Sequence, residues 1–400
     1  MKITECLQTE VAQQCDVLVC GGGFAGISAA LAAARRGKKT VLLERQFMLG
    51  GLGTAGLVTI YLPLCDGLGR QVSFGIAEEL LRLSIVHGAE ARYPKNWLDS
   101  NDPAKRTEKD PRFEVQYNAQ LFAILAEQLL LSEGVQILYG TYAVGTHIEN
   151  DRIEAVFVEN KSGRQAIACR TVIDATGDCD IAWFANAPTA LHQDGNVMAA
   201  WYYSVAESEY RLNLLGFCDV PEGAKEVNKV ELSNNRRYGG VDGTEVSEFM
   251  QQSHASTLNH VLKQKKESGK QIWPVTLATV PQFRMTRRLV GEYELDISES
   301  HAVFEDSVGL IANWRKREPV YEVPFRTLYS SKMKNLLTAG RCISVTDAMW
   351  DISRVIPCCA VTGEAAGVAA AMSEDFTTLS VPELQAELRK NGVVLHESEL

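Results

Sequence analysis

The chain has 400 residues, with 40 basic and 50 acidic side chains that give a formal charge of −10. This acidic balance argues against a nucleic-acid-binding protein and against a polybasic membrane-surface protein. Hydrophobic residues make up 46% and charged residues 22%, so we expect a globular protein of two or three domains that buries a large core.

The ten cysteines predict neither a metal site nor a thioredoxin-type motif, because none are spaced as Cys-x-x-Cys. Several stand in apolar stretches, which fits a reducing compartment, and we expect a cytoplasmic protein. Residues 1–14 lack the apolar core of a signal peptide. A run of about 18 apolar residues would be needed to predict a membrane span, and none occurs.

Residues 16–44 follow the order strand, glycine loop, helix of small residues, strand ending in an acid. In the loop, Gly21 allows a tight turn, Gly23 lets a pyrophosphate approach the backbone, and Gly26 lets the helix pack closely on the sheet. The N–H groups that begin the helix attract phosphate. Glu44 stands where an acid accepts hydrogen bonds from the adenosine ribose, which favours FAD or NAD over NADP. The alternative is a glycine-rich turn without a ligand.

A second glycine-rich segment follows at 48–56, with four glycines in nine residues. Such a backbone must pass close to another group, although a flexible glycine loop would have the same sequence pattern. Further along, 134–144 predicts a helix end and then a strand, and 151–173 alternates as a β-meander does. That meander leads into a strand that ends in Ala175-Thr-Gly177.

The last motif is Asn335-Leu-Leu-Thr-Ala-Gly-Arg341, followed by a helix that we predict to run to Met372. Pro357 suits the first helical turn, where its missing N–H costs nothing. Gly363 and Gly367 give this helix a slim side, for which close packing is the simple explanation. Its N-terminus is a candidate for stabilising negative charge that develops on a reduced flavin.

Together these motifs resemble the FAD-dependent oxidoreductase family, which has the glutathione-reductase-type FAD fold and is distantly related to succinate dehydrogenase and fumarate reductase flavoproteins. The segments 284–291, with Arg-x-x-Arg-Arg, and 321–342 carry the more specific part of the resemblance, which spans about 16–372. It implies an α/β fold: a Rossmann-like FAD-binding domain with a β-meander, plus an inserted α+β substrate or cap domain. The 46–56 loop contains no histidine for covalent attachment, so we expect non-covalent FAD.

The residues expected to contact FAD come from the motifs just described. They are Gly21, Gly23, Phe24, Ala25, Gly26, Glu44, Arg45, Gly50, Gly51, Leu52, Thr54, Ala55, Ala143, Ala175, Thr176, Gly177, Gly340, Arg341, Arg354, Val355 and Ile356.

We expect the FAD-binding domain to be discontinuous and the cap to be continuous in sequence. The predicted boundaries are 1–75, 112–182 and 330–375 for the FAD-binding domain, 183–329 for the cap, 76–111 for an exposed loop region, and 376–400 for a C-terminal helix and tail. Ser380 and Glu383 fit a capping box at the start of that helix.

Arg354 and Arg284 are the candidates for catalysis. Arg354 precedes the helix expected to face the flavin, and Arg284 belongs to a cationic cluster with Arg287 and Arg288 that suits carboxylate binding. The alternative is that these arginines pair with internal acids. The candidate proton shuttles His192, His254, His260 and His301, and the pocket candidates Tyr202 and Tyr203, are each as readily structural. Cys358 and Cys359 are expected to be packed thiols, because adjacent cysteines make a strained disulfide.

The leading hypothesis is an FAD-dependent dehydrogenase or reductase that moves hydride between a small organic molecule and the flavin. One alternative is an NAD-dependent dehydrogenase, which leaves the 50–56 loop and the Ala-Thr-Gly motif unexplained. Another is a flavin-binding protein without redox activity. The substrate, the electron acceptor and any homo-oligomer are open, and no nucleic acid, membrane span or metal is expected.

Overall fold

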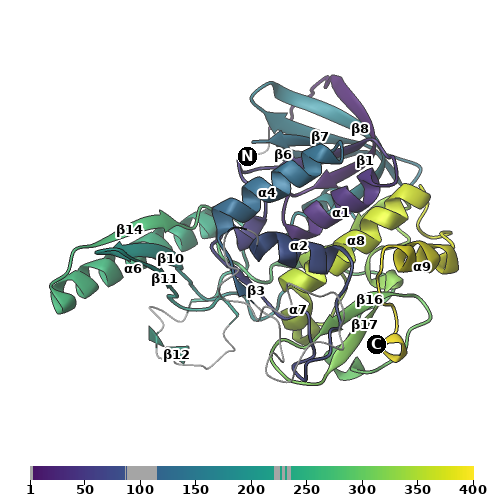
Figure 1. The fold of residues 1–400 in the computed structure, drawn as a ribbon. Coiled ribbons are helices and arrows are strands. Elements are labelled where there is room, and N and C mark those ends of the chain that lie inside the picture. The colour runs from purple at the N-terminus through teal and green to yellow at the C-terminus, as the bar shows by residue number, and fades with distance from the viewer. Residues whose placement is uncertain (1–2, 86, 88–114, 220–225, 228–229, 232–235) are drawn as a thin grey trace.

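A computed structural model of the protein describes residues 3–85, 87, 115–219, 226–227, 230–231 and 236–400. Its core is a seven-stranded sheet in the order β5-β2-β1-β8-β7-β6, in which β18 also pairs with β8 (Figure 1). The parallel strands are β1 (Val11–Cys20), β2 (Thr40–Glu44), β5 (Gln136–Tyr139), β8 (Gly163–Asp174) and β18 (Leu336–Thr338). The predicted β-meander is formed by β6 (Tyr142–Glu149), β7 (Arg152–Asn160) and β8, which pair antiparallel.

Two helices of small residues pack together against this sheet (Figure 1). The first, α1 (Phe24–Ala34), follows the glycine loop, and the second, α8 (Ile356–Met372), ends where predicted, with Pro357 in its first turn. A Cβ atom at Gly363 or Gly367 would lie 2.2 or 2.3 Å from a backbone oxygen of α1. The slim side of α8 is therefore required by backbone-to-backbone packing.

Three further helices lie beside this core. They are α2 (Ile76–Ile85), α4 (Ala119–Ser132) and α9 (Val381–Lys390). The antiparallel hairpin of β16 (Ser307–Ala312) and β17 (Val320–Pro324) also shares the hydrophobic core of α1 and α8. Within the described residues no single helix is long and apolar enough to cross a membrane; α7 (Asp347–Ser353) and α8 meet those criteria only as a pair bent by 90°.

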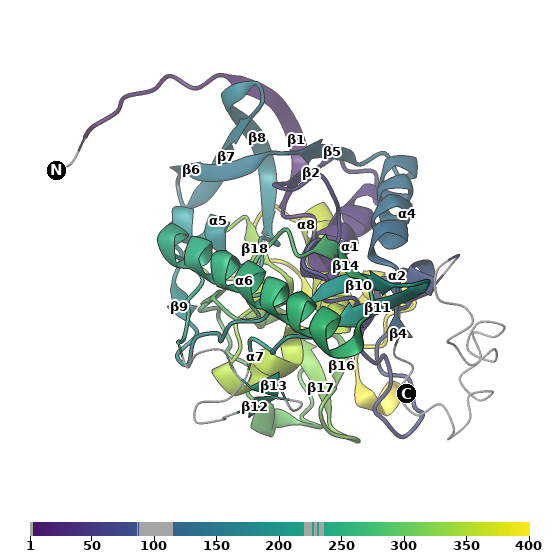
Figure 2. The ribbon, with the colours of Figure 1, turned by 90° about the vertical axis from the view of Figure 1, so that its left-hand side faces the viewer.

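A second unit extends from the body on one side (Figure 1). It contains the antiparallel sheet β11-β10-β14, made of β10 (Tyr202–Ala206), β11 (Glu209–Asn213) and β14 (Ile272–Leu277), and the long helix α6 (Gly243–Ser268). Figure 2 shows α6 crossing the face of the molecule beside these strands. The unit falls within the predicted cap, although the division of the chain into domains stays a prediction.

The remaining elements are short. They are β3 (Ile60–Tyr61) paired with β4 (Val115–Gln116), α5 (Asp180–Phe184), β9 (Thr189–Leu191) paired with β15 (Arg287–Leu289), and β12 (Glu226–Val227) paired with β13 (Val230–Glu231).

Two predictions about the periphery are wrong. The exposed loop region predicted for 76–111 begins with α2, which buries one apolar side in the core; residues 88–114 lie outside the described part of the chain. The helix predicted after Ser380 forms, but the Ser380 side chain accepts no hydrogen bond from it, so the capping box is absent. The buried residues Ile76, Leu80 and Ile85 of α2 recur with helical spacing and its charged residues lie on the other side, which is the pattern of an amphipathic helix.

Candidate functional site

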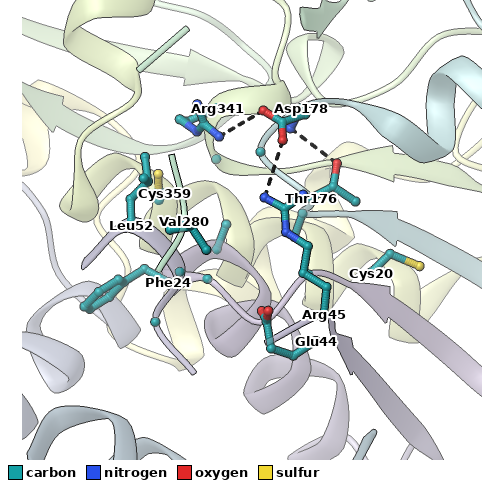
Figure 3. A pocket seen from close by; sticks show the side chains of 18 of the residues that line it. Cys20, Phe24, Glu44, Arg45, Leu52, Thr176, Asp178, Val280, Arg341 and Cys359 are labelled. Carbon is teal, nitrogen blue, oxygen red and sulfur yellow. Dashed lines mark hydrogen bonds and ion pairs between the residues drawn. The ribbon is translucent and has the colours of Figure 1, made fainter. Parts of the chain in front are cut away.

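An elongated pocket opens at the carboxyl ends of β1, β2, β8 and β18, where open α/β sheets bind their ligands (Figure 3). It encloses about 1250 Å³ of empty space, part of which is open to solvent. Its walls come from the segments 20–25, 43–46, 50–53, 141–143, 175–178, 280–283 and 339–341, together with Asp180, Arg354, Ile356 and Cys359.

The three glycines of the first loop are required for different reasons. Gly21 has φ +105°, and a Cβ there would lie 2.4 Å from the carbonyl oxygen of Ala175. A Cβ at Gly26 would lie 1.8 Å from the carbonyl oxygen of Gly21, which confirms its close packing on the sheet. Gly23 has φ −71° and no neighbouring atom within 4 Å of an added Cβ, so neither strain nor protein packing requires a glycine. The space beside Gly23 is therefore free of protein atoms, in a residue that lines the pocket.

The start of α1 is available to an anion. Gly23 is its N-cap residue, and no side chain caps the helix. The first N–H groups of a helix have no partner within it, and together with the helix dipole they favour phosphate. The residues around Gly23 therefore fit the diphosphate of a dinucleotide.

The second glycine segment is held firmly against the first. Gly50 N donates to Gly22 O at 2.8 Å, and Tyr117 Oη donates to Gly53 O at 2.6 Å. A Cβ at Gly53 would lie 2.4 Å from the ring of Phe24. The segment is thus a wall of the pocket that packs against the first glycine loop and Phe24.

Glu44 lies at the bottom of the view in Figure 3, at the end of β2. Its two carboxylate oxygens accept hydrogen bonds from Gly22 N at 2.8 Å and Gln46 N at 2.7 Å. Burial raises the pKa of Glu44, and these hydrogen bonds oppose the rise. Each oxygen keeps a second lone pair, so Glu44 fits the predicted contact with a ribose.

Arg45 extends toward Asp178 from the opposite wall, with 3.8 Å between Nη2 and Oδ2 (Figure 3). Asp178 also accepts from Arg341 Nη2 at 3.2 Å and from Thr286 Oγ1 at 2.8 Å. Its neighbour Asp180 has a pKa raised to about 6, by burial first and by the Asp178 charge second. The sequence interpretation missed both aspartates, although Asp178 directly follows the Ala-Thr-Gly motif.

Most of the predicted FAD contacts line this pocket, and four do not. Gly26 lies beneath the loop, Thr54 and Ala55 lie behind the second glycine segment, and Val355 caps α8. Thr54 Oγ1 donates to Leu49 O, and Ala55 O accepts from Thr279 N at 2.8 Å. That all the lining residues contact FAD stays a prediction.

The pocket has a further wall, formed by Val280, Pro281 and Phe283, that no local motif predicted. Figure 3 shows Val280 beside Leu52 and Cys359. The segment is tied to the core because Gln282 Nε2 donates to Gly56 O at 2.6 Å. A contact between residues 226 positions apart leaves no signal in a single sequence.

The two candidate catalytic arginines differ in position. Arg354 lines the pocket, is 8% exposed, and pairs with Asp351 at 2.7 Å and with Asp219. Arg284 is buried, lies over the ring of Trp201, and is not among the residues that line the pocket. Burial lowers the pKa of Arg284.

Arg287 and Arg288 pair with internal acids, as the alternative interpretation predicted. Arg287 pairs with Asp180 at 2.6 Å, and Arg288 pairs with Glu294 at 2.9 Å.

None of the four candidate histidines lines the pocket, and neither does Tyr202 or Tyr203. Cys358 and Cys359 are free thiols, as predicted. Burial raises the pKa of Cys359 to about 12, so its sulfur is a weak nucleophile. No cluster that could hold a metal occurs in the described residues.

Comparison with known proteins gives a family and distant relatives. The model of the family "FAD dependent oxidoreductase" matches residues 16–201 and 196–388. Thiamine thiazole synthase of Methanococcus maripaludis strain C5 is 30% identical over 179 residues, which is 42% of this chain and 62% of the relative. The chain thus spans less than two thirds of the length of that relative.

Solved structures that resemble the chain share little sequence with it. A geranylgeranyl bacteriochlorophyll reductase-like protein from Thermoplasma acidophilum is 14% identical, with 94% of this chain and 83% of the other covered and a TM-score of 0.47. The OxyS anhydrotetracycline hydroxylase from Streptomyces rimosus is 13% identical, with 94% and 65% covered and a TM-score of 0.46.

The family match covers nearly all of the sheet, the glycine segments and α8. The pocket formed by these segments has the uncapped start of α1 and the open space at Gly23 that fit a dinucleotide. The chain therefore belongs to the FAD dependent oxidoreductase family, as an enzyme with FAD as its cofactor.

Proposed function

We propose that this enzyme holds FAD non-covalently and moves hydride between the flavin and a small organic substrate. The observation that carries the proposal is Gly23, because it lines the pocket and no atom of the protein accounts for its missing side chain. Non-covalent binding is supported by the absence of histidine from residues 46–56.

In this proposal each part of the pocket has a separate task. Gly23 and the first N–H groups of α1 bind the diphosphate, and Glu44 accepts from the ribose. FAD, when bound, supplies a two-electron acceptor and donor. The uncapped start of α8 faces the same pocket through Ile356 and Cys359 and favours negative charge there.

The wall of Val280, Pro281 and Phe283 has the complementary task of excluding water. These residues line the pocket beside the second glycine segment, and apolar side chains there lower the local polarity. Arg341 fixes this wall, because its Nη1 donates to Phe283 O at 3.0 Å and to Arg284 O at 3.1 Å.

The first experiment is the visible spectrum of the purified protein before and after acid precipitation. We expect a yellow protein that releases FAD into the supernatant. Yellow colour left in the pellet would contradict non-covalent binding. Anaerobic bleaching by hydroxy acids, amines, sugars or unsaturated acids would then find the substrate, and a bound flavin that none of them reduces would favour the non-redox alternative.

The matched variant is Gly23→Val, which places a side chain in the space assigned to the diphosphate. We expect folded protein without FAD, measured by circular dichroism and by flavin content. A Gly23→Val protein with its full complement of FAD would contradict the assignment.

The cytoplasmic location, the electron acceptor and any homo-oligomer remain predictions from the sequence.

A further inference from the structure

A second cavity, the α6 cavity, lies behind the 280–283 wall, within the unit formed by α6 and the β11-β10-β14 sheet. Its lining comes from residues 199–201, from one side of α6 and from the end of β14. It encloses about 260 Å³ of empty space, part of which is open to solvent, and it has room for about one water molecule. Neither the FAD assignment nor the hydride transfer proposed above gives this cavity a task.

A single segment of chain separates the α6 cavity from the pocket. Pro281 and Phe283 line the pocket, Ala278 and Gln282 line the α6 cavity, and Val280 lines both. The segment lies outside the helices and strands, so the wall is one chain thick. A molecule bound in the pocket therefore meets the α6 cavity at Val280.

The wall is anchored on both sides of Val280. Thr279 N donates to Ala55 O at 2.8 Å, and Gln282 Nε2 donates to Gly56 O at 2.6 Å. Within the described residues no backbone hydrogen bond involves Val280 itself. Its side chain can therefore change position or be replaced without loss of a hydrogen bond, while the anchors keep the wall in place.

The lining of the α6 cavity favours an apolar group. Trp201 and Leu277 contribute large apolar side chains, and the described residues that line the cavity include no Asp, Glu, Lys or Arg. Two of its polar side chains already have partners, since Ser253 Oγ donates to Ala199 O at 2.8 Å and Gln282 Oε1 accepts from Trp201 N at 3.1 Å. A charged group would lose its hydration there without gaining a partner, whereas an alkyl group loses nothing.

The size of the α6 cavity limits that group to a short one. Room for about one water molecule is close to the size of a methyl group. Ala199, Ala200 and Ala278 keep part of the lining short, and the unbranched side chain of Met250 can yield to a slightly larger group.

We propose that the α6 cavity receives a short alkyl group of the substrate, which passes out of the pocket beside Val280. The substrate class is then a small organic molecule that carries a methyl, ethyl or propyl substituent. This inference rests on the proposed function, because it identifies the substrate side of the same pocket. Val280 is in this view a specificity-determining residue, since its side chain sets the width of the opening.

The test uses the FAD-loaded protein and benzyl alcohol with its para-methyl, para-ethyl and para-propyl derivatives. The flavin absorption spectrum reports the dissociation constant of each compound. We expect each carbon that enters the α6 cavity to tighten binding roughly fourfold, the effect of burying one CH₂ group, and the gain to end once the cavity is full. Binding that does not depend on the substituent would contradict the proposal.

Ala278→Leu fills the α6 cavity from a position that does not line the pocket. We expect this variant to bind benzyl alcohol as the wild type does and to lose the gain from the substituents. The matched control is Ala255→Leu, which adds the same atoms at an exposed position of α6 that lines neither space. Ala278→Val adds fewer atoms and decides the question if Ala278→Leu does not fold.

Val280→Ala tests the passage between the two spaces. It shortens the side chain that both share, so we expect the substituted compounds to bind about threefold tighter than to the wild type, relative to benzyl alcohol. Combining it with Ala278→Leu should abolish this gain. A gain that persists in the double variant would place the substituent elsewhere in the pocket and contradict the proposal.

The remaining outcomes separate this inference from the proposed function. Flavin-loaded protein in which Ala278→Leu and Ala255→Leu behave alike contradicts the alkyl site while the proposed function stands. The same applies if none of the four compounds changes the flavin spectrum. Protein that holds no FAD contradicts the proposed function and this inference with it.

Discussion

The helices α8 and α6 represent the two halves of the molecule, and they are stabilised differently. In α8, 14 of 17 residues are buried, and its glycines bring its backbone against that of α1. In α6, four of 26 residues are buried, and Leu258 and Leu262 are more than half exposed. Backbone packing tolerates almost no change of side chain, whereas a half-exposed helix tolerates many.

This difference also separates the first glycine loop from the 280–283 wall. The first glycine loop and Glu44 are close together in sequence, at the ends of β1 and β2. The 280–283 wall and Arg354 depend on contacts between distant segments, such as Gln282 with Gly56 and Asp219 with Arg354. We therefore expect substitutions at the packed glycines to abolish folding, and substitutions on the exposed side of α6 to have little effect.

The largest effect is expected for Gly26→Val. A Cβ there would lie 1.8 Å from the carbonyl oxygen of Gly21, so α1 must move away from the sheet. Overpacking of this severity costs more than about 4 kcal/mol, a large part of the stability of a typical protein. Urea unfolding and soluble yield would measure it.

Gly23→Val is the matched control for this prediction, since an added Cβ there has no protein atom within 4 Å. With both proteins freed of FAD, we expect it to change the free energy of unfolding by about 1 kcal/mol at most, the cost of valine at an N-cap. Equal stability of the two variants would break the distinction between glycines required for folding and the glycine required for FAD.

An intermediate effect is expected at Glu364, which is buried in α8. Its carboxylate accepts from Ile76 N at 2.8 Å and from Asn391 Nδ2 at 3.2 Å. Burial raises its pKa from 4.5 to about 7. The folded state therefore binds more protons than the unfolded state between these values, and stability falls as pH rises through this window.

Glu364→Gln should remove this loss, which is on the order of 3 kcal/mol above pH 7. Below pH 4.5 the variant should be no more stable than the wild type, since Glu364 is then protonated in both states. Urea unfolding of the FAD-loaded protein from pH 4 to 8 measures the change. Exposed Glu383→Gln is the control, and an identical pH profile for both variants would disprove the assignment.

The smallest effect is expected for Leu258→Gln on α6. Leu258 is 58% exposed, so its replacement removes little buried apolar surface. We expect a change within about 0.5 kcal/mol in the free energy of unfolding and no change in FAD content. A loss of more than about 2 kcal/mol would show that this side of α6 is covered by a contact that the described chain does not contain.

The sequence was sufficient to predict the elements that carry the glycine segments and α8. The order of strand, glycine loop, helix and acid, the meander, and the start and end of α8 all follow from local spacing. These features are local because phosphate binding and backbone packing both act on a few consecutive residues. For the same reason, Gly21 and Gly26 could be assigned roles before their contacts were known.

The tertiary structure alone decided the arrangement around the start of α8. It separated Arg354, which lines the pocket, from Arg284, which lies behind it, and it brought Asp219 and the 280–283 wall to the same place. It also showed that Arg287 and Arg288 are paired with acids. Charges on one chain give no information about distance, since ion pairs and pocket walls join residues whose separation in sequence is unrelated to their separation in space.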